Sequence, residues 1–352
     1  MMKRATKSSS AELSLISAIR GRAGAARGEL RMGIGDDCAI LRPRADEDIV
    51  VTTDLSLERV HFRREWHPAE SVGHRCLARG LSDLAAMGAR PVAAFLSLAL
   101  PGELTRKRGR GANWMDRFLD GFFRLAELHN VSLAGGDLAQ SPEVGDGVSL
   151  VTADIILLGA VVRGRAMLRS GARVGDRIYV TGSLGGAAAE LLALERNPQR
   201  FQRAHANAEH PHLYPRPRLD VGRKLVANKM ATAAIDISDG LSTDLTHLCE
   251  ESGLAAEVDA AVLPIHLMAV LAEKAGWTRS AEALALHGGE DYELLFTAPP
   301  SVSVPRSISG VPIHAIGRMV AMHDRKALIT LRSGRRREAL EPGGWQHFHP
   351  QR

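Results

Sequence analysis

The sequence predicts a mixed α/β (α+β) protein with two lobes. The chain has 352 residues, which corresponds to two domains of about 100–200 residues each. Hydrophobic residues make up 45% of the chain, as is usual for a globular protein. Strand-like and helix-like segments are mixed without the strict alternation of a single doubly wound sheet. Small and charged residues at 163–172 place the boundary near residue 165, between domains 1–165 and 166–352.

The first domain is expected to combine strands with two amphipathic helices. Residues 48–54 and 92–100 are β-branched or apolar runs that end at a carboxylate and before a proline, as strands often do. Leucines recur at helical spacing within residues 77–84, and a second apolar stripe covers residues 114–128. Further strands are expected at residues 131–134, before a turn at the glycine pair 135–136, and at residues 148–158.

The second domain repeats one local arrangement. Residues 177–181 and 232–237 are strand-like, and each runs into a glycine-containing loop followed by a helix. The first loop, residues 182–186, has the composition of a phosphate-binding turn, but simple loop geometry is the favoured interpretation. Two more strands are expected at residues 294–297 and 311–316.

Composition and charge exclude several classes of protein. No apolar run approaches the ~20 residues of a membrane-spanning helix, and the N-terminal segment lacks the apolar core of a secretory signal. Cys38, Cys76 and Cys249 lie far apart, which favours a reducing cytoplasm. The net charge of +5 (45 basic minus 40 acidic residues) is concentrated in residues 106–110 and 335–337 without interleaved aromatics. We therefore expect a soluble, cytoplasmic protein with no nucleic-acid or membrane partner.

Six aspartates lie beside small residues at the ends of predicted elements: Asp37, Asp54, Asp83, Asp137, Asp236 and Asp239. Taken singly, each is most simply a turn former or a helix cap. Gathered in one cleft, they would repel one another unless cations neutralised them. Oxygen ligands without histidine or cysteine select hard cations such as Mg²⁺, which usually bridges carboxylates to substrate phosphates. Phosphoryl transfer from a nucleotide is therefore the leading chemistry.

The nucleotide phosphates must be held in an uncommon way, because the chain has neither a Walker loop nor a protein-kinase signature. Residues 287–293 place three carboxylates after a glycine pair at the mouth of a strand. This segment is either a functional turn or a solvated connection. His61 lies between apolar neighbours, where a packed or surface histidine is the simpler interpretation.

Eight short motifs occur in order along nearly the whole chain. They are residues 33–39, 52–54 with 60–62, 81–89, 134–137, 169–172, 236–241, 288–293 and 344–348. Together they resemble the thiamine-monophosphate kinase family, whose superfamily includes aminoimidazole ribonucleotide synthetase and selenophosphate synthetase. The resemblance implies transfer of the ATP γ-phosphoryl group to thiamine phosphate, the last step of thiamine diphosphate biosynthesis. It implies several Mg²⁺ ions and no side chain acting as acid or base.

The resemblance also assigns roles to single residues and lobes. It implies a homodimer formed through the sheet of the N-terminal lobe, which binds ATP and Mg²⁺, and an α/β C-terminal lobe that completes the nucleotide and substrate site. The implied Mg²⁺ ligands are Asp37, Thr52, Thr53, Asp54, Asp83, Asp137, Asp236 and Asp239. The implied nucleotide contacts are Gly136, Asp137, Arg169 and Ser238. The implied thiamine phosphate contacts are His61, Glu290 and Trp345.

Three features depart from the family pattern. Trp114 stands where the family often has a tyrosine near the adenine, so the adenine contact stays unassigned. Glu58 and Arg59 replace a glycine-containing approach to the segment around His61, which alters the expected loop. The arginine-rich loop 106–110 is longer than in the family and has no assigned role.

Two other functions remain open. One is another ATP-dependent, phosphate-activating reaction of the superfamily, as in aminoimidazole ribonucleotide synthetase. Selenophosphate synthetase and the hydrogenase-maturation relative are disfavoured, because their N-terminal and C-terminal reactive cysteines have no counterpart here. The other is a non-catalytic nucleotide- or metal-binding protein that has kept the fold. It predicts the loss of some acidic ligands, yet every position that can be matched is filled.

Overall fold

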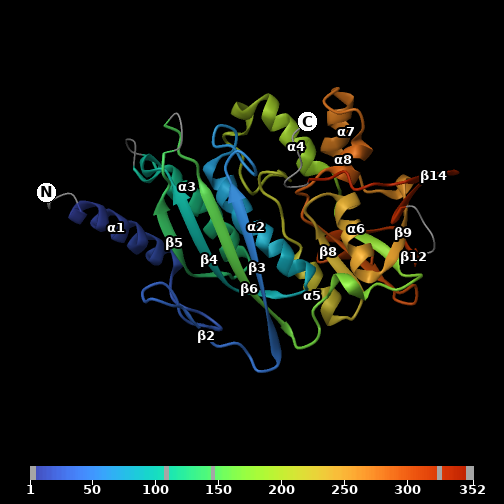
Figure 1. The fold of residues 1–352 in the computed structure, drawn as a ribbon, viewed down its shortest axis with the longest axis horizontal. Helices are drawn as coiled ribbons and strands as arrows, with labels where there is room; N and C mark the ends of the chain where they lie inside the picture. Colours follow the sequence, from blue (N-terminus) through green and yellow to red (C-terminus); the bar gives the residue numbers. More distant parts are fainter. Residues whose placement is uncertain (1–4, 107–110, 144–146, 323–326, 346–352) are drawn as a thin grey trace. The chain divides into compact units, whose positions relative to one another are not determined.

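The computed structural model describes residues 5–106, 111–143, 147–322 and 327–345 (Figure 1). Internal contacts divide the chain into two units, each with its own sheet. Unit 1 comprises Met1–Gly80 and Pro91–Ala160, and unit 2 comprises Leu81–Arg90 and Val161–Arg352. None of the helices within the described ranges has both the length and the hydropathy that a bilayer crossing needs.

Unit 1 is built on a four-stranded sheet in the order β3, β6, β4, β5, with a separate ribbon of β1 and β2. Strands β4 and β5 run parallel. The elements are α1 (Ala5–Ala23), β1 (Leu30–Met32), β2 (Ile40–Leu41), β3 (Glu47–Leu57), α2 (Ala69–Ala86), β4 (Arg90–Leu100), η1 (Gly102–Thr105), α3 (Trp114–Leu128), β5 (Ser132–Gln140) and β6 (Thr152–Val162).

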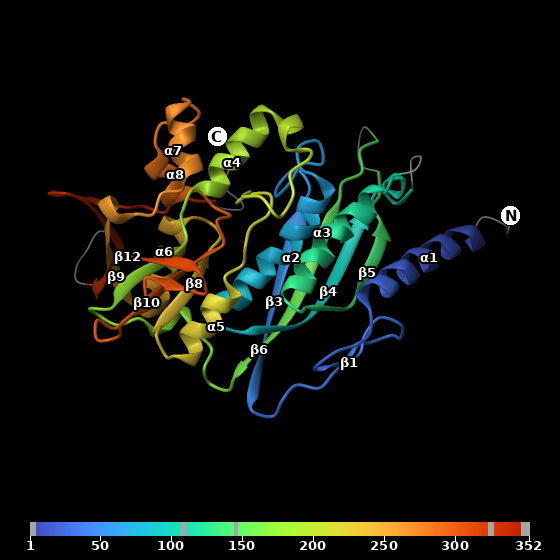
Figure 2. The ribbon, with the colours of Figure 1, turned by 180° about the vertical axis from the view of Figure 1, so that it is seen from behind.

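Helices α2 and α3 lie on one face of this sheet (Figure 2). Helix α3 begins where the Asn113 side chain accepts a hydrogen bond from Asp116 N at 2.7 Å, as an N-cap does. The two helices approach so closely that a Cβ at Gly73 would lie 1.9 Å from the Phe118 carbonyl oxygen. A Cβ at Gly121 would lie 1.8 Å from the Glu70 carbonyl oxygen. Glycine at both positions therefore sets the distance between these helices.

Unit 2 is built on a larger sheet in the order β14, β13, β9, β12, β7, β10, β8, to which β11 adds through β12. The elements are η2 (Arg169–Gly171), β7 (Arg177–Thr181), α4 (Gly186–Arg196), η3 (Pro198–Phe201), α5 (Leu219–Ala227), β8 (Ala233–Ile237), α6 (Leu241–Ser252), β9 (Leu254–Asp259), η4 (Ala260–Val262), α7 (Leu267–Lys274), α8 (Ala281–His287), β10 (Glu293–Ala298), β11 (Ser307–Ile308), β12 (Val311–Ala321), β13 (Ile329–Ser333) and β14 (Arg336–Ala339).

The core of unit 2 lies between this sheet and helix α6. Ile235 and Ile237 of β8 pack with Leu245 and Leu248 of α6 in one buried cluster. Helices α4, α7 and α8 contact one another and form a separate group (Figure 1). The end of α2 also belongs to unit 2, where Gly222 of α5 comes so close that a Cβ would lie 2.0 Å from the Ala85 carbonyl oxygen.

Most predicted elements are present, including β4, α3, β7 and α6. The expected turn at the glycine pair 135–136 is wrong, because β5 continues through both glycines to Gln140. Gly136 has φ +147°, and a Cβ there would lie 1.9 Å from the Leu96 carbonyl oxygen. The pair therefore permits a close strand contact beside a register shift in β4 and β5.

The strand expected at residues 148–158 begins later, as β6. Val151 N donates to the Glu58 side chain at 2.7 Å, and Val151 O accepts from Glu58 N at 3.1 Å. These two bonds hold Val151 against Glu58 directly before β6 begins. A contact between a side chain and a distant backbone group cannot be recognised from hydrophobic periodicity.

Substituting Gly121→Ala is expected to destabilise the protein by roughly 1–3 kcal/mol, because the new methyl group overlaps the Glu70 carbonyl and forces α2 and α3 apart. Gly21→Ala is the control, since Gly21 lies within α1 with nothing within 4 Å of its Cβ position. Alanine there should stabilise the helix by up to about 1 kcal/mol. Urea unfolding measures both changes. Equal midpoints for the two variants would contradict the close helix crossing.

Candidate functional site

The loop between β8 and α6 is the centre of the candidate site. All residues of β8 are buried, so its Asp236 carries a carboxylate into the interior, where only 5% of the residue is exposed. The chain then turns at Gly240, which has φ +106°, a conformation that favours glycine. A Cβ at Gly240 would also lie 2.9 Å from the His287 carbonyl oxygen. The loop is therefore fixed both by its backbone conformation and by close packing.

Three carboxylates share this loop: those of Asp236, Asp239 and Asp244. The Asp244 side chain accepts hydrogen bonds from Ser238 N at 3.1 Å and Asp239 N at 3.0 Å. Burial, followed by the negative charges of Asp236 and Asp239, raises the pKa of Asp244 from 3.8 to about 8, although the two backbone donors oppose the shift. The negative charge of this cluster favours a bound proton or cation. Sequence reasoning missed Asp244, which lies in the first turn of α6.

The same loop collects other predicted site residues of unit 2. Asp236 accepts a hydrogen bond from Ser82, the neighbour of Asp83 on α2, at 2.7 Å. Glu290 N donates to Ser238 O at 2.7 Å, and Trp345 N donates to Asp239 O at 3.2 Å. Segments distant in sequence, around residues 82, 238, 290 and 345, therefore meet at one loop.

Arg169 is the predicted unit 2 residue that the structure does not bring to this loop. Its carbonyl oxygen accepts a hydrogen bond from Ser252 at the C-terminal end of α6. The aspartate loop lies at the N-terminal end of α6. The two ends of a helix of this length are about 18 Å apart. The Arg169 side chain is exposed.

The acidic turn around residue 290 is held by three separate contacts. Glu290 and Tyr292 adopt φ +66° and +51°, which is unusual for residues with a Cβ. The Glu290 carboxylate lies 3.0 Å from His212 Nδ1. Glu293 forms a buried ion pair with Arg218 and accepts a hydrogen bond from Thr181. The turn is therefore an ordered part of unit 2 and not a solvated connection.

Asp291 explains the glycine loop 182–186. Its carboxylate accepts hydrogen bonds from Gly185 N at 2.6 Å and Ala187 N at 3.1 Å, at the start of α4. These amides would have to face a phosphate if the loop were a phosphate cradle. The loop is thus capped by the protein's own carboxylate, in agreement with simple loop geometry.

In unit 1, the alternation of β3 separates two neighbouring threonines. Thr52 and Asp54 lie on the face toward α2, where a Cβ at Gly80 would contact Thr52 at 3.6 Å and Arg79 pairs with Asp54 at 2.6 Å. Thr53 lies on the opposite, exposed face. Successive residues of a strand point to opposite faces, so the Thr53 side chain does not join those of Thr52 and Asp54.

His61 lies in the turn that follows β3. Its Nδ1 accepts a hydrogen bond from Leu57 N at 3.0 Å, which leaves the ring proton on Nε2. Arg59 adopts φ +71°, the left-handed conformation that the family's glycine would favour. Glu58 is buried and pairs with Arg64 at 2.6 Å. The departure at these two positions therefore keeps the turn and adds an internal ion pair.

The other predicted ligand residues of unit 1, Asp37, Gly136 and Asp137, are exposed. Asp37 lies on the glycine-rich segment after β1, and its N–H donates to Asp36 Oδ1 at 3.0 Å. Asp137 of β5 follows Gly136 directly and lies opposite Ser97 of β4. Trp114 stacks on Phe118 with ring centroids 5.5 Å apart. Most of the loop 106–110, and residues 346–348 of the last motif, lie outside the described residues.

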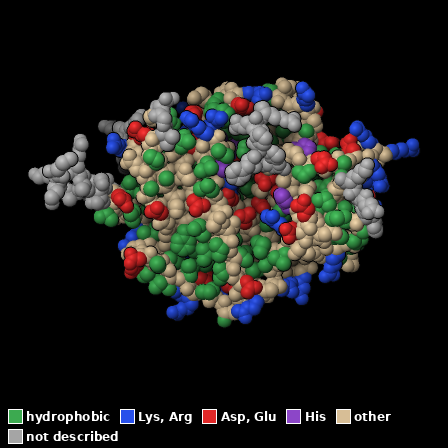
Figure 3. Space-filling model, in the orientation of Figure 1, with side chains coloured by type: hydrophobic (Ala, Val, Ile, Leu, Met, Phe, Trp, Pro, Cys, Tyr) green, Lys and Arg blue, Asp and Glu red, His purple; other side chains and the backbone are tan. Residues whose placement is uncertain are grey.

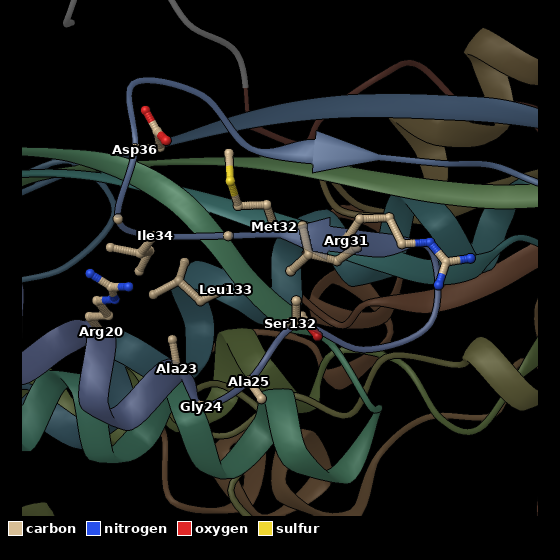
Figure 4. Close-up of a pocket in the computed structure, with 14 residues that line it drawn as sticks. Arg20, Ala23, Gly24, Ala25, Arg31, Met32, Ile34, Asp36, Ser132 and Leu133 are labelled. Carbon is tan, nitrogen blue, oxygen red and sulfur yellow. The ribbon is translucent and has the colours of Figure 1, made fainter.

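A cavity of about 440 Å³ lies beside this glycine-rich segment (Figure 4). Arg20 of α1, Ile34 and Leu133 lie close to one another at its wall, and Asp36 stands on the adjoining loop (Figure 4). None of the predicted ligand or substrate residues lines it. In the described part of the chain, no group of three His, Cys, Asp or Glu side chains is placed so that it could hold a metal ion.

Comparisons with known proteins identify relatives over most of the chain. The family models for the N-terminal and C-terminal domains of AIR synthase related proteins match residues 35–161 and 173–325. Thiamine-monophosphate kinase of Escherichia coli is 36% identical over 345 residues, which cover 96% of this chain and 98% of that protein.

Solved structures agree with these matches. Thiamine-monophosphate kinase from Stenotrophomonas maltophilia has a TM-score of 0.73 and 36% identity, covering 91% of this chain and 95% of that one. AaThiL, complexed with AMPPCP and TMP, has a TM-score of 0.70 and 30% identity, covering 96% of this chain and 97% of that one. The predicted two-domain mixed α/β fold and the family resemblance are both confirmed.

Asp291→Asn is expected to weaken the pH dependence of stability. Burial raises the pKa of Asp291 from 3.8 to about 7 in the folded protein, against the opposing effect of its backbone donors. The folded state therefore binds this proton more tightly than the unfolded state, and stability falls as the pH rises from about 4 to about 7. Asparagine cannot ionise and removes this contribution.

Urea unfolding at several pH values between about 4.5 and 8 measures the slope. Glu195→Gln is the control, because Glu195 is exposed on α4, the helix whose first turn Asp291 caps, and should leave the slope unchanged. A wild-type slope in Asp291→Asn would show that Asp291 does not hold a proton at neutral pH.

Proposed function

Because the chain belongs to the thiamine-monophosphate kinases of the AIR synthase-related family, we propose that it transfers the γ-phosphoryl group of ATP to thiamine phosphate by direct in-line displacement. The products are thiamine diphosphate and ADP. The observation that carries the proposal is the cluster of the buried Asp236 and Asp244 with the partly exposed Asp239, whose charge suits a cation bound together with phosphates.

The reaction needs no catalytic base. A phosphate monoester has its second pKa near ~6, so the attacking oxygen of thiamine phosphate is already anionic at neutral pH. The protein must hold two anions in line and offset their charge. Carboxylates cannot do this alone, because they repel the same phosphates.

We propose Mg²⁺ as the ion that bridges the carboxylates of the protein and the phosphates of the substrates. Mg²⁺ keeps several waters and binds through one or two carboxylates plus substrate phosphates, so the acidic loop suits it without a complete protein cage. When bound, it would neutralise charge on the transferred phosphoryl group. The proposed ligands are Asp37, Thr52, Asp54, Asp83, Asp137, Asp236 and Asp239, with Thr53 contributing through its backbone because its side chain lies on the other face of β3.

Nucleotide and substrate contacts follow from the family resemblance. We propose Gly136, Asp137, Arg169 and Ser238 for ATP, whose elongated shape allows Arg169 to contact a different part from Ser238. We propose His61, Glu290 and Trp345 for thiamine phosphate. Trp345 is 53% exposed, and its ring can stack on the cationic thiazolium with a gain of about 0.5–2 kcal/mol. The proposed domains remain 1–165 for ATP, Mg²⁺ and dimerisation, and 166–352 for completing the site.

A homodimer is proposed through the uncovered face of the unit 1 sheet. Ile49, Val51 and Leu55 of β3 are 37%, 60% and 45% exposed and point to the same side. Figure 3 shows hydrophobic side chains gathered over this sheet. Contiguous exposed apolar surface of this kind commonly marks a protein interface.

The first test is a coupled assay with ATP, Mg²⁺ and thiamine phosphate, with unphosphorylated thiamine as the control acceptor. Thiamine diphosphate should form from thiamine phosphate alone. ATP turnover without this product would favour another phosphate-activating reaction of the superfamily. Absence of turnover with every phosphate acceptor would favour a binding protein.

Asp236→Asn is expected to lower kcat by at least ~100-fold, because it removes a ligand charge while keeping the size of the side chain and an acceptor for Ser82. Asp220→Asn, at a side chain that is 74% exposed on α5, is the matched control and should keep the wild-type rate. The variants are compared at limiting Mg²⁺. A wild-type rate for Asp236→Asn would contradict its role as a ligand.

Val51→Glu is expected to convert the dimer to a monomer, because a charge on the apolar sheet face would be buried in the interface. Val174→Glu is the control: Val174 is equally exposed, at 61%, but lies in unit 2. Light scattering after gel filtration gives the mass of each variant. A dimer that survives Val51→Glu would place the interface elsewhere.

A further inference from the structure

The segment between η3 and α5 is organised around one buried carboxylate. Glu190 of α4 is 0% exposed. Its Oε2 accepts hydrogen bonds from His212 N at 2.8 Å and Leu213 N at 3.2 Å. Its Oε1 lies 2.5 Å from His210 Nδ1. The backbone at residues 210–213 is therefore held from inside unit 2 rather than left as a free surface loop.

This support fixes the position of the His212 ring. His212 is only 2% exposed, and its Nδ1 lies 3.0 Å from Glu290 Oε2, within ion-pair distance but outside hydrogen-bond geometry. The Glu290 side chain is 24% exposed, so part of the carboxylate remains accessible to a ligand. Its backbone is held independently, because Glu290 N donates to Ser238 O of the aspartate loop at 2.7 Å.

We infer that His212 is a positioning residue for thiamine phosphate binding: it holds the Glu290 carboxylate in the orientation in which that group meets the substrate. The inference rests on the proposed function, in which Glu290 contacts thiamine phosphate. The aminopyrimidine ring of thiamine carries an amino group, the kind of donor that a carboxylate accepts. A carboxylate held in one orientation loses less conformational freedom on binding than a mobile one.

A purely structural histidine is the competing interpretation, since buried histidines commonly satisfy packing and hydrogen bonding. The two interpretations differ in one respect. A structural residue affects stability and both substrates together, whereas a positioning residue for Glu290 affects the KM for thiamine phosphate and spares the KM for ATP.

The test compares two variants of similar shape. His212→Asn keeps a polar nitrogen near the position of Nδ1, whereas His212→Leu has a similar size and no polar atom. We expect His212→Leu to raise the KM for thiamine phosphate by roughly tenfold, the scale of one lost polar contact. The KM for ATP should stay at the wild-type value, and His212→Asn should restore most of the affinity for thiamine phosphate.

A control separates this effect from the loss of any buried histidine. His266 is 9% exposed, and its Nε2 lies 3.2 Å from Glu209 in the same unit. His266→Leu should lower stability without changing the KM for thiamine phosphate. Urea unfolding of each variant establishes that the folded enzyme is being assayed. If His212→Leu does not fold, His212→Asn still decides the matter, since a raised KM in that variant overturns the inference.

Glu290→Gln and the double variant complete the experiment. Glu290→Gln should raise the KM for thiamine phosphate, and adding His212→Leu should cause little further change, because the two residues act through one contact. Equal effects of His212→Leu and His212→Asn, or additive effects with Glu290→Gln, overturn the inference. A wild-type KM in Glu290→Gln overturns the role of Glu290 and the inference with it. Failure of the unmodified enzyme to form thiamine diphosphate overturns the proposed function itself.

Discussion

Electrostatic repulsion among Asp236, Asp239 and Asp244 is the constraint on which the candidate site depends. The raised pKa of Asp244, about 8, shows that burial and two neighbouring charges outweigh two backbone hydrogen bonds. The loop is held by its surroundings as well as by its own hydrogen bonds to Asp244. Gly344 comes so close to it that a Cβ would lie 1.8 Å from the Asp239 carbonyl oxygen. Functional sites often keep such locally unfavourable groups in place by over-determined packing.

Other buried acids of unit 2 show what a structural carboxylate is like. Glu190 and Asp291 receive backbone N–H donors from neighbouring segments, and Glu293 pairs with Arg218. Each of these acids ties two parts of the chain together. The aspartate loop differs in degree, because Asp244 has two other carboxylates as its charged neighbours, whereas Asp291 has one, Glu293. A sequence motif does not show how many like charges surround a buried acid.

Local patterns predicted much of the fold and part of the candidate site. Hydrophobic spacing located α3 and α6, and small residues beside aspartates pointed to Asp236 and Asp239. The same patterns failed where the deciding contact is long-range. Asp244 looks like an ordinary residue of the first helical turn, and His212 lies in a segment without periodicity. Val151, directly before β6, donates to the side chain of Glu58, 93 positions away. Arg59 adopts a left-handed backbone conformation, which sequence reasoning expects at a glycine and not at an arginine.

Phosphoryl transfer to a phosphate gives this acidic loop its physical logic. Both proposed substrates are anions and the loop is negative, so substrate binding and cation binding must favour each other. A cation that reaches the loop would also favour the ionised form of Asp244, because it would offset the charges of Asp236 and Asp239 that oppose ionisation. Ionised Asp244 is the better acceptor for Ser238 N and Asp239 N. Binding would therefore tighten the loop that holds the cation, so the free energy of ordering the site is coupled to the arrival of its ligands.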